Sequence, residues 1–83
     1  MGKAGRVLKQ VLETYGISQN KLAVTMGIER TVVYRWTHDR TDPVGDTITS
    51  ITSALNQLNP KAAQEFVDLY LGEIVQNDSE LLE

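Results

Sequence analysis

The chain has 83 residues, enough for one small domain, and 41% of them are hydrophobic, so disorder throughout is excluded. It contains no cysteine, which excludes disulfide bridges and thiolate metal sites, and no apolar stretch has the length of a membrane span or signal peptide. The net charge is −3, but seven of the eight basic residues lie in 1–41 and eight of the eleven acidic residues lie in 42–83.

The first predicted helix is marked by apolar residues at helical spacing, which are Val7, Leu8, Val11, Leu12 and Tyr15. Gly16 is expected to end it, because glycine is favoured just after the last turn of a helix. Ser18 is a suitable N-cap for a second helix. The expected buried side of that helix contains Leu22 and Ala23, with Met26 at its end.

A third helix is predicted from about Arg30 to His38, after a turn that contains Gly27. On a helical wheel, Val33 and Trp36 lie together and define the side that faces the core. Trp36 is therefore interpreted as a core residue rather than as a stacking platform. The opposite arc of this helix holds Thr31, Tyr34, Arg35 and His38, with Arg30 at one flank and Val32 at the other.

A connector is predicted from Asp39 to Gly45, with Pro43 inside it. Asp46 is expected to cap a fourth helix, whose apolar residues share one face: Ile48, Ile51, Ala54, Leu55 and Leu58. Asn59 before Pro60 predicts the start of a fifth helix over 60–75. Residues 76–83 are expected to form an acidic, disordered tail, in which the final Leu-Glu pair is of the kind that cloning leaves behind. The expected fold is therefore a single all-α domain over 1–75.

The polar arc of the third helix has the chemistry needed to read DNA bases. Arg30 and Arg35 can each donate two hydrogen bonds to guanine O6 and N7. Thr31 can bond a base or touch a thymine methyl group, whereas Val32 can make only the methyl contact. Tyr34 is either a DNA contact or an ordinary exposed residue, and a merely solvated helix face is the alternative interpretation of the whole arc.

Three further residues are candidates for phosphate contacts. Gln19 opens the second helix, where its side chain and the free backbone N–H groups can bind an anion. Arg40 follows the third helix and keeps its charge at any pH. His38 is expected at the surface near the end of that helix, within reach of a phosphate.

An enzyme is the least supported class of protein. The sequence has no thiol and no glycine-rich phosphate loop, and His38 is its only histidine, so no histidine metal pair can form. We therefore predict no catalytic residue, no metal site and no cofactor.

The stretch described so far resembles the helix-turn-helix domain of the Xre/Cro family of phage and bacterial repressors. The matching positions are Ser18-Gln19, Leu22-Ala23, Gly27-Ile28, Val33 with Trp36, Pro43 and Ala54-Leu55, within roughly residues 5–58. The resemblance implies a lambda-repressor-like five-helix fold in a cytoplasmic bacterial or phage protein. It also implies base contacts from Arg30, Thr31 and Arg35, with Val32 nearby, and phosphate contacts from Gln19 and the loop holding Arg40.

The sequence departs from the family pattern at three positions. Glu29 stands at the usual serine or threonine N-cap of the recognition helix, where its charge would lie near phosphates. Thr37 replaces a common glutamate, and Asp39 stands where glycine or asparagine is favoured.

The leading hypothesis is a sequence-specific DNA-binding transcriptional regulator, a repressor that binds double-stranded DNA as a homodimer on a palindromic operator. Its predicted dimer or partner interface is a stripe on the fifth helix, formed by Phe66, Val67, Tyr70, Leu71 and Ile74. Two alternatives for this stripe stay open: it completes the core of the monomer, or it receives another protein, as an antitoxin receives its toxin. The competing hypothesis for the chain is a protein-interaction module, favoured by Glu29 and the acidic charge.

Overall fold

The computed structural model describes residues 3–38, 40, 41, 43 and 45–82, with side chains for those from 4 to 72. All of the described regular structure is helical, which confirms the predicted all-α class. The helices in chain order are α1 (Lys3–Tyr15), α2 (Gln19–Met26), α3 (Arg30–Thr37), α4 (Asp46–Leu58) and α5 (Pro60–Leu82).

Two of the predicted helix starts are confirmed by their capping hydrogen bonds. The backbone N–H of Lys21 donates to Ser18 Oγ over 3.0 Å, and the N–H of Lys61 donates to Asn59 Oδ1 over 3.0 Å. The expected cap of α4 was placed one residue too late. Gly45, with φ 49° and ψ −120°, is the capping residue, and Asp46 is the first residue of the helix.

The fifth helix is longer than the sequence analysis expects. In place of an end near residue 75 and a disordered tail over 76–83, α5 continues to Leu82. No proline follows Pro60, and the last glycine of the helix is Gly72, so the sequence holds no strong signal that ends the helix near residue 75.

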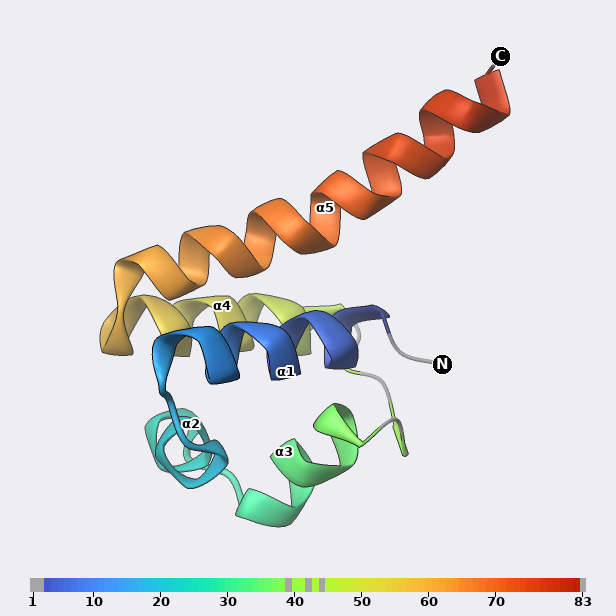
Figure 1. The fold of residues 1–83 in the computed structure, drawn as a ribbon. Coiled ribbons are helices and arrows are strands. Elements are labelled where there is room, and N and C mark those ends of the chain that lie inside the picture. Colours follow the sequence, from blue (N-terminus) through green and yellow to red (C-terminus); the bar gives the residue numbers. More distant parts are fainter. Residues whose placement is uncertain (1–2, 39, 42, 44, 83) are drawn as a thin grey trace.

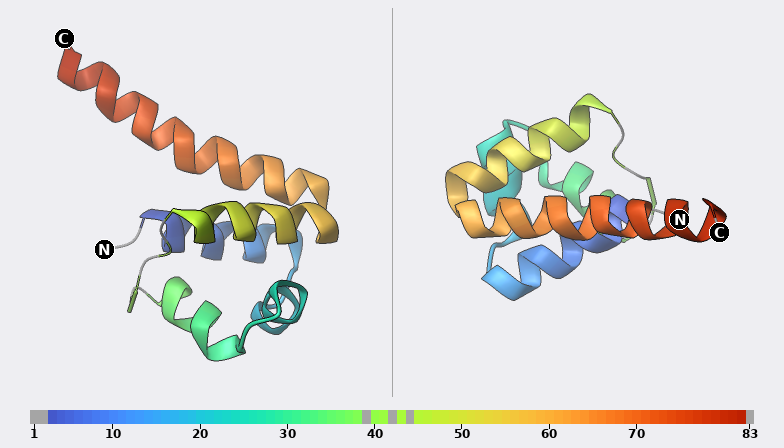
Figure 2. Two further views of the ribbon diagram at one scale, coloured as in Figure 1. Left: turned by 180° about the vertical axis from the view of Figure 1, so that it is seen from behind. Right: turned by 90° about the horizontal axis from the view of Figure 1, so that it is seen from above.

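The helices form three layers (Figures 1 and 2). α5 packs against both α1 and α4, while α2 and α3 lie on the opposite side of these two helices. All five helices contribute to one core, and the predicted buried faces of the first four are confirmed. The buried residues of this core are Val7, Leu8, Val11, Leu12, Leu22, Ala23, Val33, Trp36, Ile51, Ala54, Leu55, Ala62, Ala63 and Phe66.

Gly5 permits the closest approach between α1 and the end of α3. A Cβ atom at this position would overlap the carbonyl oxygen of Trp36, which is backbone and has little freedom to move. The sequence gives no local sign of this requirement, because Gly5 lies inside a regular helix. The small residue therefore sets the distance between α1 and α3.

Tyr15 links α1 to α5 through a polar contact at the edge of the core. Its hydroxyl donates to Glu65 Oε1 over 3.1 Å, between residues that are 50 positions apart. Partial burial raises the pKa of the Tyr15 phenol above its ordinary value of 10.0, and the hydrogen bond to Glu65 and the charge of that carboxylate raise it further.

We predict that Gly5→Ala lowers the free energy of unfolding by about 1–3 kcal/mol, because the added methyl group forces α1 away from Trp36. Gly72→Ala is the matched control: its Cβ would meet nothing within 4 Å, so the same change should raise stability by about 0.5–1 kcal/mol. Urea unfolding followed by circular dichroism measures both effects. Equal effects of the two substitutions would contradict the close approach.

We predict that Tyr15→Phe lowers stability at neutral pH and that its cost shrinks above about pH 10. The pKa of Tyr15 is raised on folding, so its contribution is fully present below the unfolded pKa and is lost as the pH rises through the folded one. Urea unfolding at neutral and alkaline pH measures the difference, with Tyr34→Phe at an exposed position as the control. A cost independent of pH would show that the Glu65 contact does not stabilise the neutral phenol.

Candidate nucleic-acid interface

The turn between α2 and α3 is closed by backbone hydrogen bonds at Gly27. Gly27 has φ 73°, a left-handed conformation that costs a residue with a side chain about 1–2 kcal/mol. Its N–H donates to the Val24 carbonyl over 3.1 Å, and the N–H of Ile28 donates to the Ala23 carbonyl over 3.0 Å. α2 therefore ends abruptly, and α3 begins at Arg30 after the turn 27–29.

One side of α3 is anchored in the core. Val33 and Trp36 are 0% and 6% exposed, which confirms their predicted role. Val32 is half-buried and lines a small hollow with Met26 and Ile28, bounded by Thr47 of α4. Val32, which the sequence places at the flank of the polar arc, thus lies partly against α4.

The other side of α3 is exposed. Arg30, Thr31, Tyr34 and Arg35 lie there, and we call these four residues the reading surface. Three of them line an open hollow of about 620 Å³ together with the start of α2. The lining residues of this hollow are Ser18, Gln19, Asn20, Arg30, Thr31 and Tyr34. Arg30, Thr31 and Tyr34 therefore lie beside Gln19, the predicted phosphate contact, whereas Arg35 does not line this hollow.

Asn20 and Ser18 belong to the same hollow, although the sequence analysis did not select them as contact residues. Asn20 is exposed and can donate and accept hydrogen bonds. The available signal was its place directly after Gln19 in the first turn of α2. Ser18 is already engaged, because its hydroxyl oxygen caps that helix.

Tyr34 and His38 form a stacked pair on α3, with ring centroids 3.8 Å apart and planes inclined by 17°. His38 Nδ1 lies 2.9 Å from the carbonyl oxygen of Tyr34 and 3.1 Å from Thr37 Oγ1. The hydroxyl of Thr37 donates to the same carbonyl over 3.1 Å. These contacts hold the His38 ring against Tyr34.

Arg40 stays close to the end of α3. Its backbone N–H donates to the carbonyl of Arg35 over 2.9 Å, so the chain turns back after the helix. Arg35, His38 and Arg40 are all exposed at this end. Asp39, where the sequence departs from the expected glycine or asparagine, lies outside the described residues.

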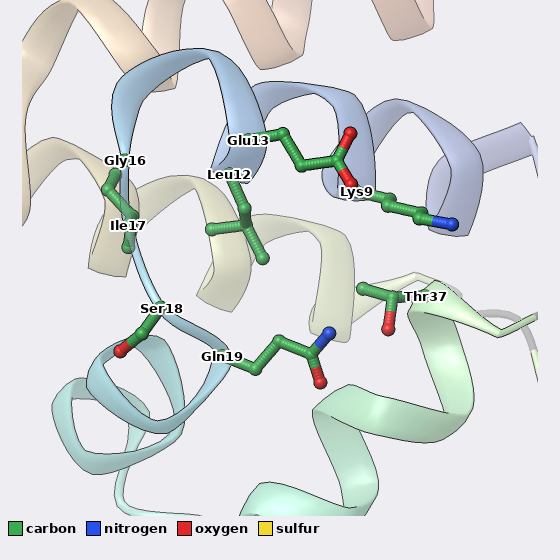
Figure 3. Close-up of a pocket in the computed structure, with 8 residues that line it drawn as sticks. All are labelled: Lys9, Leu12, Glu13, Gly16, Ile17, Ser18, Gln19 and Thr37. Atoms are coloured by element: carbon green, nitrogen blue, oxygen red, sulfur yellow. The ribbon is translucent and has the colours of Figure 1, made fainter.

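A second hollow, of about 350 Å³, lies between α1, the start of α2 and the end of α3. Figure 3 shows Gln19 extending from α2 towards Thr37 on α3, with Lys9 and Glu13 on α1 beside it. Lys9 is exposed and lines the same hollow as Gln19, together with the acidic Glu13. Lys9 could not be selected from the sequence, because the path of α1 past α2 is a tertiary feature.

Glu29 is the N-cap of α3, but its side chain makes no capping hydrogen bond. Its carboxylate instead accepts from the hydroxyl of Thr31 over 3.5 Å. An acidic group therefore lies at the edge of the reading surface, beside Arg30.

The charged side chains are partly separated in space as well as in the sequence. Lys21, Arg30 and Arg35 are exposed on α2 and α3, while Glu65 and Asp68 lie on α5. α5 is on the opposite side of the molecule from α3 (Figure 1). The reading surface is therefore on the basic side of an acidic protein.

The predicted interface on α5 is corrected at Phe66, whose side chain is fully buried in the monomer core. Tyr70 is half-buried and stacks on Phe66 with ring centroids 6.2 Å apart, and Val67 is also half-buried. Leu71 is 48% exposed, and the side chain of Ile74 lies outside the described residues. Much of the stripe thus completes the core, because α5 must cover both α1 and α4.

Among the described residues, no group of three or more histidine, aspartate or glutamate side chains is arranged to hold a metal ion. No helix of the described chain is both long and apolar enough to cross a membrane. Comparison with protein-family models, curated proteins and solved structures gives no match to the chain.

Proposed function

We propose that this protein binds double-stranded DNA sequence-specifically, through a lambda-repressor-like helix-turn-helix formed by α2 and α3. The observation that carries the proposal is the two-sided character of α3. On one side of α3 the side chains of Val33 and Trp36 are buried. The exposed residues of the other side are Arg30, Thr31, Tyr34 and Arg35. A helix that is anchored on one side and polar on the other suits the major groove of DNA, which is wide enough to admit it.

The residues on this surface and the residues beside it have separate roles in the proposed complex. Arg30 and Arg35 present guanidinium groups to the base edges, where guanine O6 and N7 accept two hydrogen bonds. Gln19 and the free N–H groups at the start of α2 bind a phosphate, and Arg40 binds another beyond the end of α3. The phosphate contacts fix the orientation of α3, and the base contacts select the sequence.

The separation of charge supports the same orientation. A net charge of −3 would repel DNA if it were spread evenly over the surface. Because the acidic side chains of Glu65 and Asp68 belong to α5, they lie away from DNA that meets α3. Repulsion between DNA and the acidic α5 then favours encounters in which the basic side of the protein faces the duplex.

The proposed regulator acts as a homodimer on a palindromic operator in bacterial or phage DNA. One recognition helix contacts too few base pairs for useful specificity, so two copies on adjacent half-sites are needed. An occupied operator near a promoter excludes polymerase, which makes repression the simplest outcome.

We predict that Arg35→Ala weakens binding to a selected operator by about 1–3 kcal/mol and relaxes the preference at one base pair. Fluorescence anisotropy with a labelled duplex measures the loss. Lys61→Ala removes the same charge from the exposed face of α5 and should leave the affinity unchanged. The proposed reading surface is wrong if Arg30→Ala and Arg35→Ala both bind as the wild type does.

We predict that DNA binding weakens steeply as salt rises, because phosphate contacts release counterions from the duplex. Arg40→Ala should weaken binding to all sequences alike and make the salt dependence shallower by about one unit of slope. Anisotropy titrations at several salt concentrations give this slope, with Lys61→Ala again as the control. An unchanged slope for Arg40→Ala would exclude its phosphate contact.

The alternative function is a protein-interaction module, and the acidic Glu29 at the reading surface is the observation that favours it. A carboxylate near phosphates opposes DNA binding by charge repulsion. Titration with a pool of random duplexes at low salt separates the two functions. Absence of binding there would support the interaction module and overturn the DNA-binding proposal.

A further inference from the structure

Glu29 presents a carboxylate that the described fold does not use. It precedes α3 as the N-cap, but its side chain does not bond the free N–H groups of the first turn. Its contact is with Thr31, whose hydroxyl lies 3.5 Å from Glu29 Oε1, and none of the described basic side chains forms an ion pair with it. The carboxylate is therefore an exposed acceptor held beside the reading surface.

The position of Glu29 places this acceptor at the outer edge of the molecule. Figure 1 shows the start of α3 on the side farthest from α5, where no other helix covers it. In the proposed DNA complex, the first turn of α3 enters the major groove, so Glu29 and Arg30 arrive there together. A phosphate would repel this carboxylate, so the favourable partner for Glu29 in the groove is a hydrogen-bond donor on a base edge.

The major groove offers a carboxylate few partners. An ionised carboxylate only accepts hydrogen bonds, and the donors on the base edges are cytosine N4 and adenine N6. Adenine also presents the acceptor N7 next to N6, which repels the second carboxylate oxygen. Cytosine has no such neighbouring acceptor, so it is the base that the carboxylate of Glu29 accommodates best.

We propose that Glu29 determines the specificity for one cytosine in each half-site, by accepting a hydrogen bond from its N4 amino group. Thr31 orients the carboxylate through its hydroxyl. This inference rests on the proposed DNA-binding function. Guanine and thymine at the same position leave the carboxylate against acceptors, so Glu29 acts largely by weakening incorrect sites.

The test is selection of bound duplexes from a random pool by the wild type, Glu29→Gln and Glu29→Ala. The wild type should select a cytosine at one position of each half-site. Glu29→Gln should shift that position to adenine, because an amide can donate to N7 and accept from N6. Glu29→Ala should lose the preference there. Anisotropy should show that exchanging this C·G pair for T·A weakens the wild type about tenfold or more and leaves Glu29→Ala unchanged.

Two controls separate specificity from charge and from folding. Asp68→Asn removes the same charge from an exposed position of α5, away from the reading surface, and should select the wild-type sequence. Melting curves of the Glu29 variants should coincide with that of the wild type, because the side chain makes no capping bond. If both Glu29 variants select the wild-type sequence, this inference is overturned while DNA binding stands. If the wild type selects no duplex, the proposed function is overturned as well.

Discussion

The burial of Val33 and Trp36 is the constraint on which the rest of this structure depends. It fixes the rotation of α3 about its axis, and so decides which side chains remain exposed. It also requires α1 to lie against the end of α3, which Gly5 allows because it has no side chain to collide with the Trp36 carbonyl. Val33 and Trp36 are not part of the reading surface, yet a change in either would move that surface relative to α2.

The parts of the fold that were predicted from the sequence depend on local chemistry. The caps at Ser18 and Asn59 follow from side chains that bond nearby N–H groups, and helical spacing alone separates Val33 and Trp36 from the polar arc. The missed features are tertiary. Gly5 is special only because of Trp36, and Tyr15 meets Glu65 across 50 positions of chain. Each of these pairs joins two different helices, so neither could be foreseen from the local sequence.

The candidate site, too, was predicted where helical spacing decides the position of a residue and missed where tertiary packing decides it. Composition and spacing suffice to place Arg30, Thr31 and Arg35 on one exposed side, because a helix wheel needs no tertiary information. Val32 was harder, since a flank position can belong to either side, and the proximity of α4 decides it. Phe66 was misassigned because a wide apolar stripe does not show which part covers its own core. The Tyr34–His38 stack had a readable signal in its four-residue spacing.

The burial of Phe66 has a consequence for how the proposed dimer would assemble. Ala62, Ala63 and Phe66 of α5 are buried in the core of a single chain, so the described core is complete without a second copy. A partner would then dock onto finished domains, and folding and assembly would be separate steps. Each monomer would then stay folded at protein concentrations too low for dimers, and dimerisation at higher concentration would add stability. Operator occupancy would rise more steeply than in proportion to protein concentration. A cell could thus set the regulatory threshold by the amount of protein made, without exposing a pool of unfolded monomers to degradation.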